Sequence, residues 1–250
     1  MNLKHLGAWT AAAFALLGAS PGRPATLGEA LARLTSDDVL VADAAVEEIV
    51  AFGAPAVDSL LPRLSDPGRD VRAGAIRGLG LLGDRRAAPA LREMLGASLD
   101  HAGPDTMESR YLRILLIQAV GRLKDPDAAA LLRKAAASSD PFERTHAALS
   151  LVVSAQDPGY DLVRECVADH DPAIRALAAE GLGETSDGRA KALLLDLTRD
   201  EAWVVRDSAY RSLGRFGGDA AVREALERGS HDPSWYVRQT VAEAAAAGRR

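Results

Sequence analysis

The chain has few aromatic residues and almost no cysteine. Phe, Trp and Tyr make up 4% of its 250 residues, and Cys166 is the one cysteine. A single cysteine excludes both an intrachain disulfide and a thiolate metal cluster. The apolar residues Leu162, Val163 and Val167 lie at helical spacing around it. We therefore expect Cys166 to be a small buried residue of a helix.

The chain also lacks an excess of positive charge. It holds 30 Lys and Arg against 35 Asp and Glu, for a formal net charge of −5. A nucleic-acid-binding surface needs clustered basic residues that neutralise phosphates, whereas arginine here alternates with acidic residues. We therefore expect no nucleic-acid partner. No segment alternates between apolar and polar residues for long, so no β-sheet is expected.

What the chain does contain is a repeated segment, best seen at 169–183. Asp171 and Pro172 fit the N-cap and first position of a helix, and Gly183 is expected to end that helix in the left-handed conformation. The arginine of this segment recurs at steps of 41, 31, 31, 31 and 32 residues, the differences between the numbers of Arg72, Arg113, Arg144, Arg175, Arg206 and Arg238. A fixed period of this length is typical of a helical solenoid.

The expected fold is all-α, a right-handed α-solenoid of about seven helix pairs over residues 27–248. Each unit is too small to bury its own apolar face, so neighbouring units must stack. The predicted pairs are 27–34 with 38–52, 54–64 with 69–82, 86–95 with 108–123, 127–137 with 141–154, 158–168 with 172–182, 188–198 with 201–216, and 219–228 with 234–247.

Residues 1–26 do not belong to the repeat and are expected to form a signal-type helix. Lys4 and His5 precede an uncharged run from Leu6 to Ala19. A short basic region before an apolar run of this length is typical of a secretory signal, and the run is short for a membrane span. We therefore expect export to the periplasm, cell envelope or exterior. The alternatives are a membrane-associated leader and a misassigned start of a cytoplasmic protein.

The one long step of 41 residues predicts an insertion at 96–106, between the helices of the third repeat. Insertions in repeat proteins form loops, often on a working face. Asp100, His101 and Asp105 lie there. One histidine with scattered carboxylates is a weak metal site, so a solvated loop is the favoured interpretation.

The spacing Asp-x5-Arg, with Leu-Gly at a helix end, resembles the HEAT repeat in its bacterial phycobilisome-lyase-like form. The resemblance implies a ladder of Asp–Arg hydrogen bonds between consecutive repeats and a concave surface lined by the second helices. Ser138 and Met107 replace the aspartate in repeats 4 and 3, and Ala42 replaces the first arginine. We therefore expect a ladder that is broken between repeats 3 and 4 and absent at the N-terminal end. Its candidate members are Asp66, Arg72, Arg113, Arg144, Asp169, Arg175, Asp200, Arg206, Asp232 and Arg238.

Some proteins with this repeat are enzymes, but the sequence lacks the catalytic motifs of two such types. The deoxyhypusine-hydroxylase type holds two irons with His-Glu dipeptides, but no histidine here is followed by glutamate. His170 and His231 lie two repeats apart, about 20 Å if neighbouring helices pack at about 10 Å, which is too far to share a metal. The bilin-lyase type leaves no recognisable signature.

We assign no catalytic, cofactor-binding or metal-binding residue and expect no cofactor. The leading hypothesis is a non-catalytic scaffold or adaptor that binds a protein or peptide on its concave face. We expect a monomer and no small-molecule substrate. The alternative is a HEAT-repeat enzyme or enzyme subunit, either a metal-dependent oxidoreductase or a bilin-lyase-like protein.

The residues one, five and nine positions after each ladder arginine are expected to form the floor of the concave face. Most are charged or polar, but the middle repeats place Leu81, Ile114, Leu149 and Val153 there, between two arginines and two glutamates. An exposed apolar patch with a polar border is typical of an interaction site. The alternative is that these side chains belong to the core. The predicted floor is Arg77, Leu81, Ile114, Gln118, Arg122, Leu149, Val153, Glu180 and Glu184.

Five of the eleven aromatic residues fall in the first turn of a second helix: Tyr111, Phe142, Trp203, Trp235 and Tyr236. Two interpretations are open, because these side chains could pack between repeats or form an aromatic rim that anchors a partner.

Overall fold

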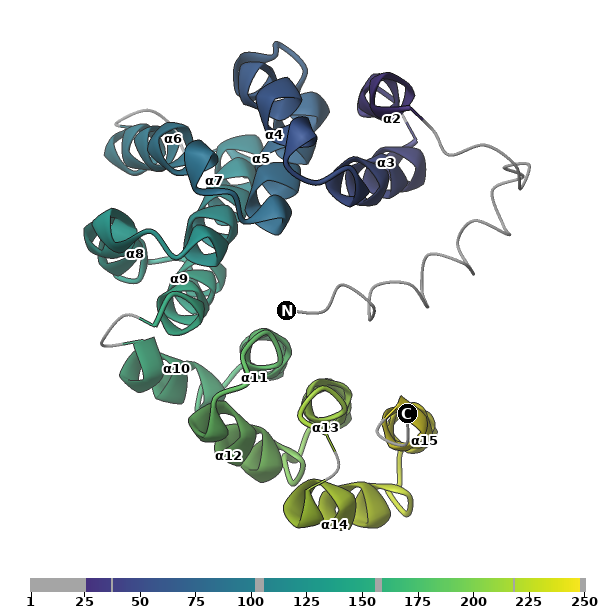
Figure 1. The fold of residues 1–250 in the computed structure, drawn as a ribbon. Helices are drawn as coiled ribbons and strands as arrows, with labels where there is room; N and C mark the ends of the chain where they lie inside the picture. Colours follow the sequence, from purple (N-terminus) through teal and green to yellow (C-terminus); the bar gives the residue numbers. More distant parts are fainter. Residues whose placement is uncertain (1–25, 37, 102–105, 156–158, 218, 248–250) are drawn as a thin grey trace.

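The structure is a computed structural model that describes residues 26–36, 38–101, 106–155, 159–217 and 219–247. These residues contain fourteen α-helices, three short 3-10 helices and no strand. The helices form an arc of stacked antiparallel pairs (Figure 1), which confirms the all-helical solenoid. The predicted leader lies outside the described residues, apart from Thr26 at its last position. None of the described helices is long and apolar enough to cross a membrane.

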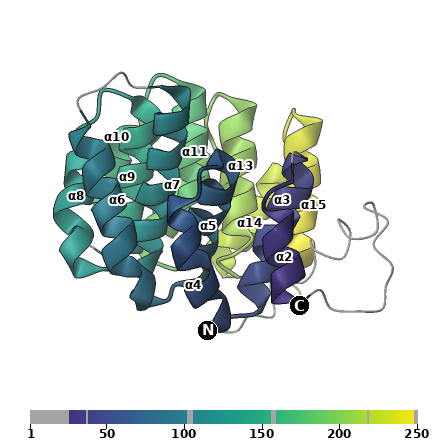
Figure 2. The same ribbon diagram turned by 90° about the horizontal axis from the view of Figure 1, so that it is seen from above.

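The first helix of each pair lies on the outside of the arc and the second on the inside, and helices of one layer lie side by side (Figures 1 and 2). The outer layer is α2 (Leu27–Arg33), α4 (Pro55–Leu60), α6 (Ala88–Asp100), α8 (Ala129–Ala135), α10 (Gly159–Val167), α12 (Gly188–Leu197) and α14 (Ala220–Gly229). The inner layer is α3 (Val39–Ala51), α5 (Arg69–Leu82), α7 (Met107–Leu123), α9 (Pro141–Val153), α11 (Pro172–Leu182), α13 (Trp203–Leu213) and α15 (Trp235–Ala247). Short 3-10 helices, η2 (Leu61–Ser65), η3 (Arg85–Ala87) and η4 (Pro126–Ala128), adjoin α4, α6 and α8.

Helix starts follow the sequence signals closely. The Asp171 carboxylate accepts the Ala173 backbone N–H at 2.8 Å, and Pro172 is the first residue of α11. Gly183, however, has φ of −70° and is not left-handed, so that prediction is wrong. Its lack of a side chain serves packing instead, because a Cβ there would lie 2.6 Å from the Ser212 hydroxyl oxygen on the next inner helix.

The predicted insertion loop is shorter than expected. Outer helix α6 continues through the first five residues of the insertion and ends at Asp100, so the expected loop boundary at residue 96 is wrong. Asp100 forms an ion pair with Lys134 on the next outer helix, α8, and His101 is exposed. Asp105 lies outside the described residues.

Direct contact between inner helices holds the array together. A Cβ on Gly80 would lie 2.7 Å from the Ala119 Cα, and one on Gly214 would lie 3.1 Å from the Ala244 Cβ. Small residues therefore let successive inner helices approach closely. The buried apolar side chains form two clusters that meet at α9, which contributes to both. Cys166 is buried in the second cluster as expected, and burial raises the pKa of its thiol.

Candidate binding surface on the concave face

Arginines of the inner helices connect consecutive repeats by bidentate ion pairs. Arg175 donates from Nε and Nη2 to the Asp200 carboxylate at 2.8 and 2.9 Å, and Arg206 donates in the same way to Asp232 at 2.7 and 2.8 Å. In both arginines Nη1 also donates to two backbone carbonyls of the preceding turn. Each arginine thus ties its own turn to the turn of the next repeat.

These ion pairs shift the protonation of the carboxyl groups. Burial alone would raise the pKa of Asp200 and of Asp232, but hydrogen bonds from Arg175 and Arg206 and from backbone N–H groups lower both pKa values below the ordinary 3.8. A carboxylate whose pKa is lowered on folding stabilises the fold above its ordinary pKa. The contribution of the two pairs is therefore present above about pH 4 and lost as the pH falls below it.

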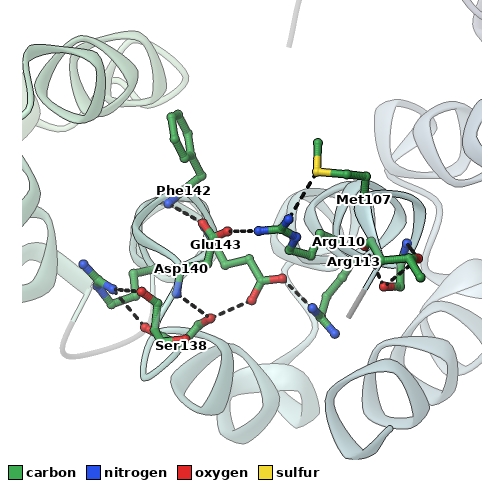
Figure 3. A network of polar contacts seen from close by, with 11 residues as sticks. Met107, Arg110, Arg113, Ser138, Asp140, Phe142 and Glu143 are labelled. Atoms are coloured by element: carbon green, nitrogen blue, oxygen red, sulfur yellow. Dashed lines mark hydrogen bonds and ion pairs between the residues drawn. The ribbon is translucent and has the colours of Figure 1, made fainter. Parts of the chain in front are cut away.

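The ladder is not broken between repeats 3 and 4, contrary to the sequence-based expectation. Arg113 Nε donates to the Glu143 carboxylate at 2.5 Å, and the Ser138 hydroxyl donates to the other oxygen of the same carboxylate at 2.7 Å (Figure 3). Glu143 is only 2% exposed. Ser138 leaves room for the longer Glu143 side chain, which supplies the carboxylate five residues further along the chain. Similarly, Glu108 replaces the missing aspartate of repeat 3 and pairs with Arg72 at 2.9 Å.

Two other connections lack the ion pair within the described residues. Ala42 offers no guanidinium, and the Asp66 carboxylate accepts only the Gly68 backbone N–H, so the first rung is absent as expected. Between repeats 4 and 5, Arg144 donates to backbone carbonyls of its own turn and forms no ion pair with Asp169. The sequence did not predict this gap, because both residues match the pattern.

A cleft of about 450 Å³ opens on the concave face where four inner helices meet. Its floor is apolar, formed by Leu149 and Val153 of α9 and Leu177 of α11, and its rim carries charges of both signs. The remaining lining residues are Gln118, Arg122, His146, Ser150, Glu180, Gly181, Glu184, Arg211, Ser212 and Arg215.

The cleft contains six of the nine predicted floor residues, namely Gln118, Arg122, Leu149, Val153, Glu180 and Glu184. Arg77, Leu81 and Ile114 do not line it, so the expectation that the four apolar residues form a single patch is wrong. Leu81 is 39% exposed, Ile114 is half-buried, and Arg77 forms an ion pair with Asp43. Arg122 and Glu184, which were expected to border the patch, form an ion pair with each other.

A family profile of HEAT repeats matches residues 25–102 and 160–246, well over half of the chain. The chain belongs to the HEAT-repeat family. The part that the profile leaves out includes α7, α8 and α9, where Glu108 and Glu143 replace the usual aspartates of the ladder. No curated protein sequence matches the chain.

The solved structures that this chain resembles are distant in sequence. The complex of CpcE and CpcF of phycocyanin lyase from Nostoc sp. PCC7120 is 20% identical, with 84% of this chain and 95% of that chain covered and a TM-score of 0.55. The YibA protein of Escherichia coli is 14% identical, with 90% and 93% covered and a TM-score of 0.50. Human deoxyhypusine hydroxylase is 15% identical, with 89% and 96% covered and a TM-score of 0.43. The likeness to the lyase and to YibA concerns the fold.

Leu149 occupies both the cleft floor and the core of the HEAT array. It is 6% exposed, so the expectation of an exposed side chain at this position is wrong. The cause is Gly181 on α11, where an added Cβ would lie 2.3 Å from Leu149 Cδ1. The leucine fills the space that the glycine leaves and closes the contact between α9 and α11.

His146 lines the cleft and was missed from the sequence. His146 lies two residues after the ladder residue Arg144, and Leu177 lies two residues after Arg175 in the next HEAT repeat. The predicted floor began only one residue after each arginine. Thr145, which was predicted there, is only 1% exposed. Residues three and four apart share a helix face, so steps of two, five or six, and nine after the arginine describe the inner face better. The predicted positions one, five and nine are each four residues apart, and residues at that strict spacing rotate gradually away from a single helix face.

The environment of His146 keeps its imidazole neutral near pH 7. Burial lowers its pKa below the ordinary 6.5, and Arg122 acts in the same direction, while Glu184 and Asp140 oppose the shift. Its Nδ1 lies 3.1 Å from the Gln118 amide nitrogen. With this amide orientation the neutral imidazole accepts the amide N–H at Nδ1.

The five predicted aromatic side chains are exposed, from 43% for Phe142 to 54% for Trp235. Each side chain is therefore only partly covered by the array, and packing between repeats accounts for part of its surface at most. The Tyr236 ring stacks on Trp203 with centroids 5.0 Å apart and on Trp235 at 4.0 Å. Phe142 points away from the ion pairs below it (Figure 3). All five lie near the N-terminal ends of the inner helices, which form one edge of the concave face (Figures 1 and 2).

A metal site needs several ligand side chains that converge on one point. In the described residues, no group of three or more His, Cys, Asp or Glu side chains is arranged to hold a metal ion. The histidines before α11 and α15 are exposed: His170 contacts its neighbour Asp169 at 3.1 Å, and His231 bonds within its own turn.

Proposed function

We propose that this HEAT-repeat protein is a non-catalytic scaffold that holds a protein or peptide segment in the cleft between α7 and α13. The observation that carries the proposal is the cleft itself, an apolar floor with a rim of both charges on the concave face. An apolar centre with a polar border is the usual composition of a protein interface. On the rim, Arg211 and Arg215 can pair with acidic groups of the bound segment, and Glu180 can pair with basic groups. Charges of opposite sign at different places on the rim can therefore fix the direction of that segment.

The aromatic edge supports the same proposal. Exposed tryptophan and tyrosine contribute strongly to binding energy because they bury a large area at little cost in conformational entropy. A segment that leaves the cleft towards the starts of the inner helices meets this edge. The net charge of −5 favours a protein partner over a nucleic acid.

The location and the handedness of the array are also part of the proposal. The basic and apolar composition of residues 1–26 favours an exported protein whose leader is cleaved off, whereas the alternative of a membrane-associated leader predicts a mature chain that retains these residues. N-terminal sequencing of the protein from its native host separates the two. We expect a right-handed superhelix and a monomer.

A crosslinking pull-down from the native host tests the scaffold. The baits are the wild-type chain, the cleft variants Val153→Arg and Glu180→Arg, and the control Ala130→Arg on the exposed surface of outer helix α8. A cleft partner is recovered with the wild type and the control, and its recovery falls about tenfold with the cleft variants. Equal recovery with all four baits contradicts the proposal. Metal analysis of the purified protein tests the alternative of a metal-dependent enzyme.

A further inference from the structure

Four kinds of residue on or next to α13 form its contact with the following helix pair, and the same four kinds recur on α15. Trp203 stacks on Tyr236, Arg206 pairs with Asp232, and the Thr240 hydroxyl donates to the Asp207 carboxylate at 2.5 Å. Gly214 provides the close approach to Ala244. Helix α13 thus offers an aromatic ring, an arginine, a polar side chain and a small residue to the helix pair that follows it.

Helix α15 offers the same four kinds of residue on its opposite side. Each lies 32 residues after its counterpart on α13, and all four are exposed: Trp235, Arg238, Gln239 and Ala246. Ala242, between the last two, is exposed as well. Among the described helices, α15 lies at one end of the inner layer and has an inner neighbour, α13, on one side only (Figure 1). We call the side of α15 that carries these residues its free face. It repeats the surface of α13 against which α14 and α15 pack.

Arg238 shows which group is missing from this face. Its Nη1 donates to the Asp232 and Pro233 carbonyls at 2.6 and 3.1 Å, as Nη1 of Arg206 does in its own turn. In Arg206 the other edge, Nε and Nη2, holds the carboxylate of the next repeat. In the described part of the chain that edge of Arg238 has no partner. The guanidinium is held in the ladder orientation, where it can accept a bidentate carboxylate.

We propose that the free face of α15 is a docking surface for a helical hairpin of a partner protein, which carries an aspartate or glutamate in the turn before its second helix. The carboxylate pairs with Nε and Nη2 of Arg238, and an apolar or aromatic residue in the first turn stacks on Trp235. The small side chains of Ala242 and Ala246 let the partner helix approach closely, as Gly214 does on α13. The surface is separate from the cleft, so the two can be tested independently.

The first experiment measures binding of a fluorescently labelled peptide with the sequence of residues 217–247, the hairpin that α13 already binds. We expect saturable binding to the full chain that Arg238→Gln weakens tenfold or more. Asp232→Asn in the peptide should weaken it by the same factor, and the two changes together should be no worse than either alone. Arg199→Gln, an exposed arginine away from the free face, is the control and should leave binding unchanged.

Two results of this experiment overturn the proposal. One is equal binding to the wild type and to Arg238→Gln. The other is binding that depends on Arg206 and not on Arg238, which shows that the peptide replaces the resident repeat. Sedimentation velocity of the full chain adds a third outcome: self-association that Arg238→Gln abolishes assigns the face to a second copy and overturns the partner hairpin.

Because a free hairpin loses conformational entropy when it docks, a second measurement adds the same hairpin in cis. The full chain is extended after Ala247 by a second copy of residues 217–247. We expect the extension to raise the midpoint of thermal unfolding, and Arg238→Gln to cancel that rise. An unchanged midpoint, with amides of the added segment exchanging as fast as in an unfolded peptide, overturns the proposal.

Discussion

Arg122 and Glu184 form a bidentate ion pair across the concave face, although a whole repeat lies between them in the chain. Arg122 Nη2 lies 2.8 Å from Oε1 and 3.0 Å from Oε2 of Glu184, and Nε lies 3.2 Å from Oε2. Helices packed at about 10 Å would place residues two repeats apart about 20 Å from each other in a straight array. The pair forms because the arc curves around α9 (Figure 1) and because the long Arg122 and Glu184 side chains bridge the remaining distance on the inner side of this bend.

This pair should contribute little to stability and should depend on salt. Its side chains are 29% and 38% exposed, and ion pairs of this kind are worth about 0.2–1 kcal/mol. A double-mutant cycle with Arg122→Gln and Glu184→Gln, measured by denaturant unfolding, should give a coupling in this range that shrinks in 1 M salt. A coupling several times larger would show a pair that holds the bend in place.

The buried ladder pairs should matter more. Arg206→Ala leaves the Asp232 carboxylate, whose side chain is 7% exposed, without its cation, and should lower the free energy of unfolding by about 2–4 kcal/mol. Arg238→Ala is the matched control, because Arg238 makes the same backbone hydrogen bonds without a carboxylate. Its effect should be much smaller. Equal losses in the two variants would assign the stabilisation to the carbonyl hydrogen bonds.

Leu149→Asp should unfold the array rather than test the cleft. The change removes a buried leucine at about 2–5 kcal/mol and strands a charge between α9 and α11. Leu81→Asp is the exposed comparison, since Leu81 is 39% exposed, and should change stability by about 0.5 kcal/mol or less. Thermal unfolding followed by circular dichroism separates the two. Similar melting points for both variants would place Leu149 on the surface.

His146 should make stability sensitive to mild acid. Its pKa is lowered in the folded state, so its neutral form stabilises the fold above the ordinary value of 6.5, and this contribution is lost as the pH falls below it. Between pH 7 and pH 5 the melting temperature of the wild type should therefore fall more than that of His146→Gln. Parallel curves for the two proteins would show that His146 titrates normally.

Close approach of the inner helices should make certain glycines irreplaceable. Gly80→Ala places a Cβ 2.7 Å from the Ala119 Cα, so α5 and α7 must move apart, at a cost of about 1–3 kcal/mol. Gly188→Ala is the control, because nothing lies within 4 Å of a Cβ there. Its effect on the free energy of unfolding should be near zero or slightly favourable.

The amino-acid sequence by itself determined the helix pairs and the order in which they stack. The recurring arginine showed the period, and turn signals such as Asp171-Pro172 placed helix starts within about two residues of those observed. These features are local, because a capping side chain or a proline acts on its own turn. The apolar face of an inner helix follows for the same reason: on α5, Val71, Ala75 and Leu79 recur at helical spacing and are buried.

Only the tertiary structure decided which residues meet across repeats. Glu143 could not be recognised as a ladder carboxylate, because its chain position differs from that of the aspartates and only its contact with Arg113 reveals its role. Arg144 and Asp169 match the pattern and yet do not pair. Leu149 is covered because a neighbouring helix has a glycine opposite it. Each outcome depends on the distance and rotation between packed helices, which the period of a sequence does not specify.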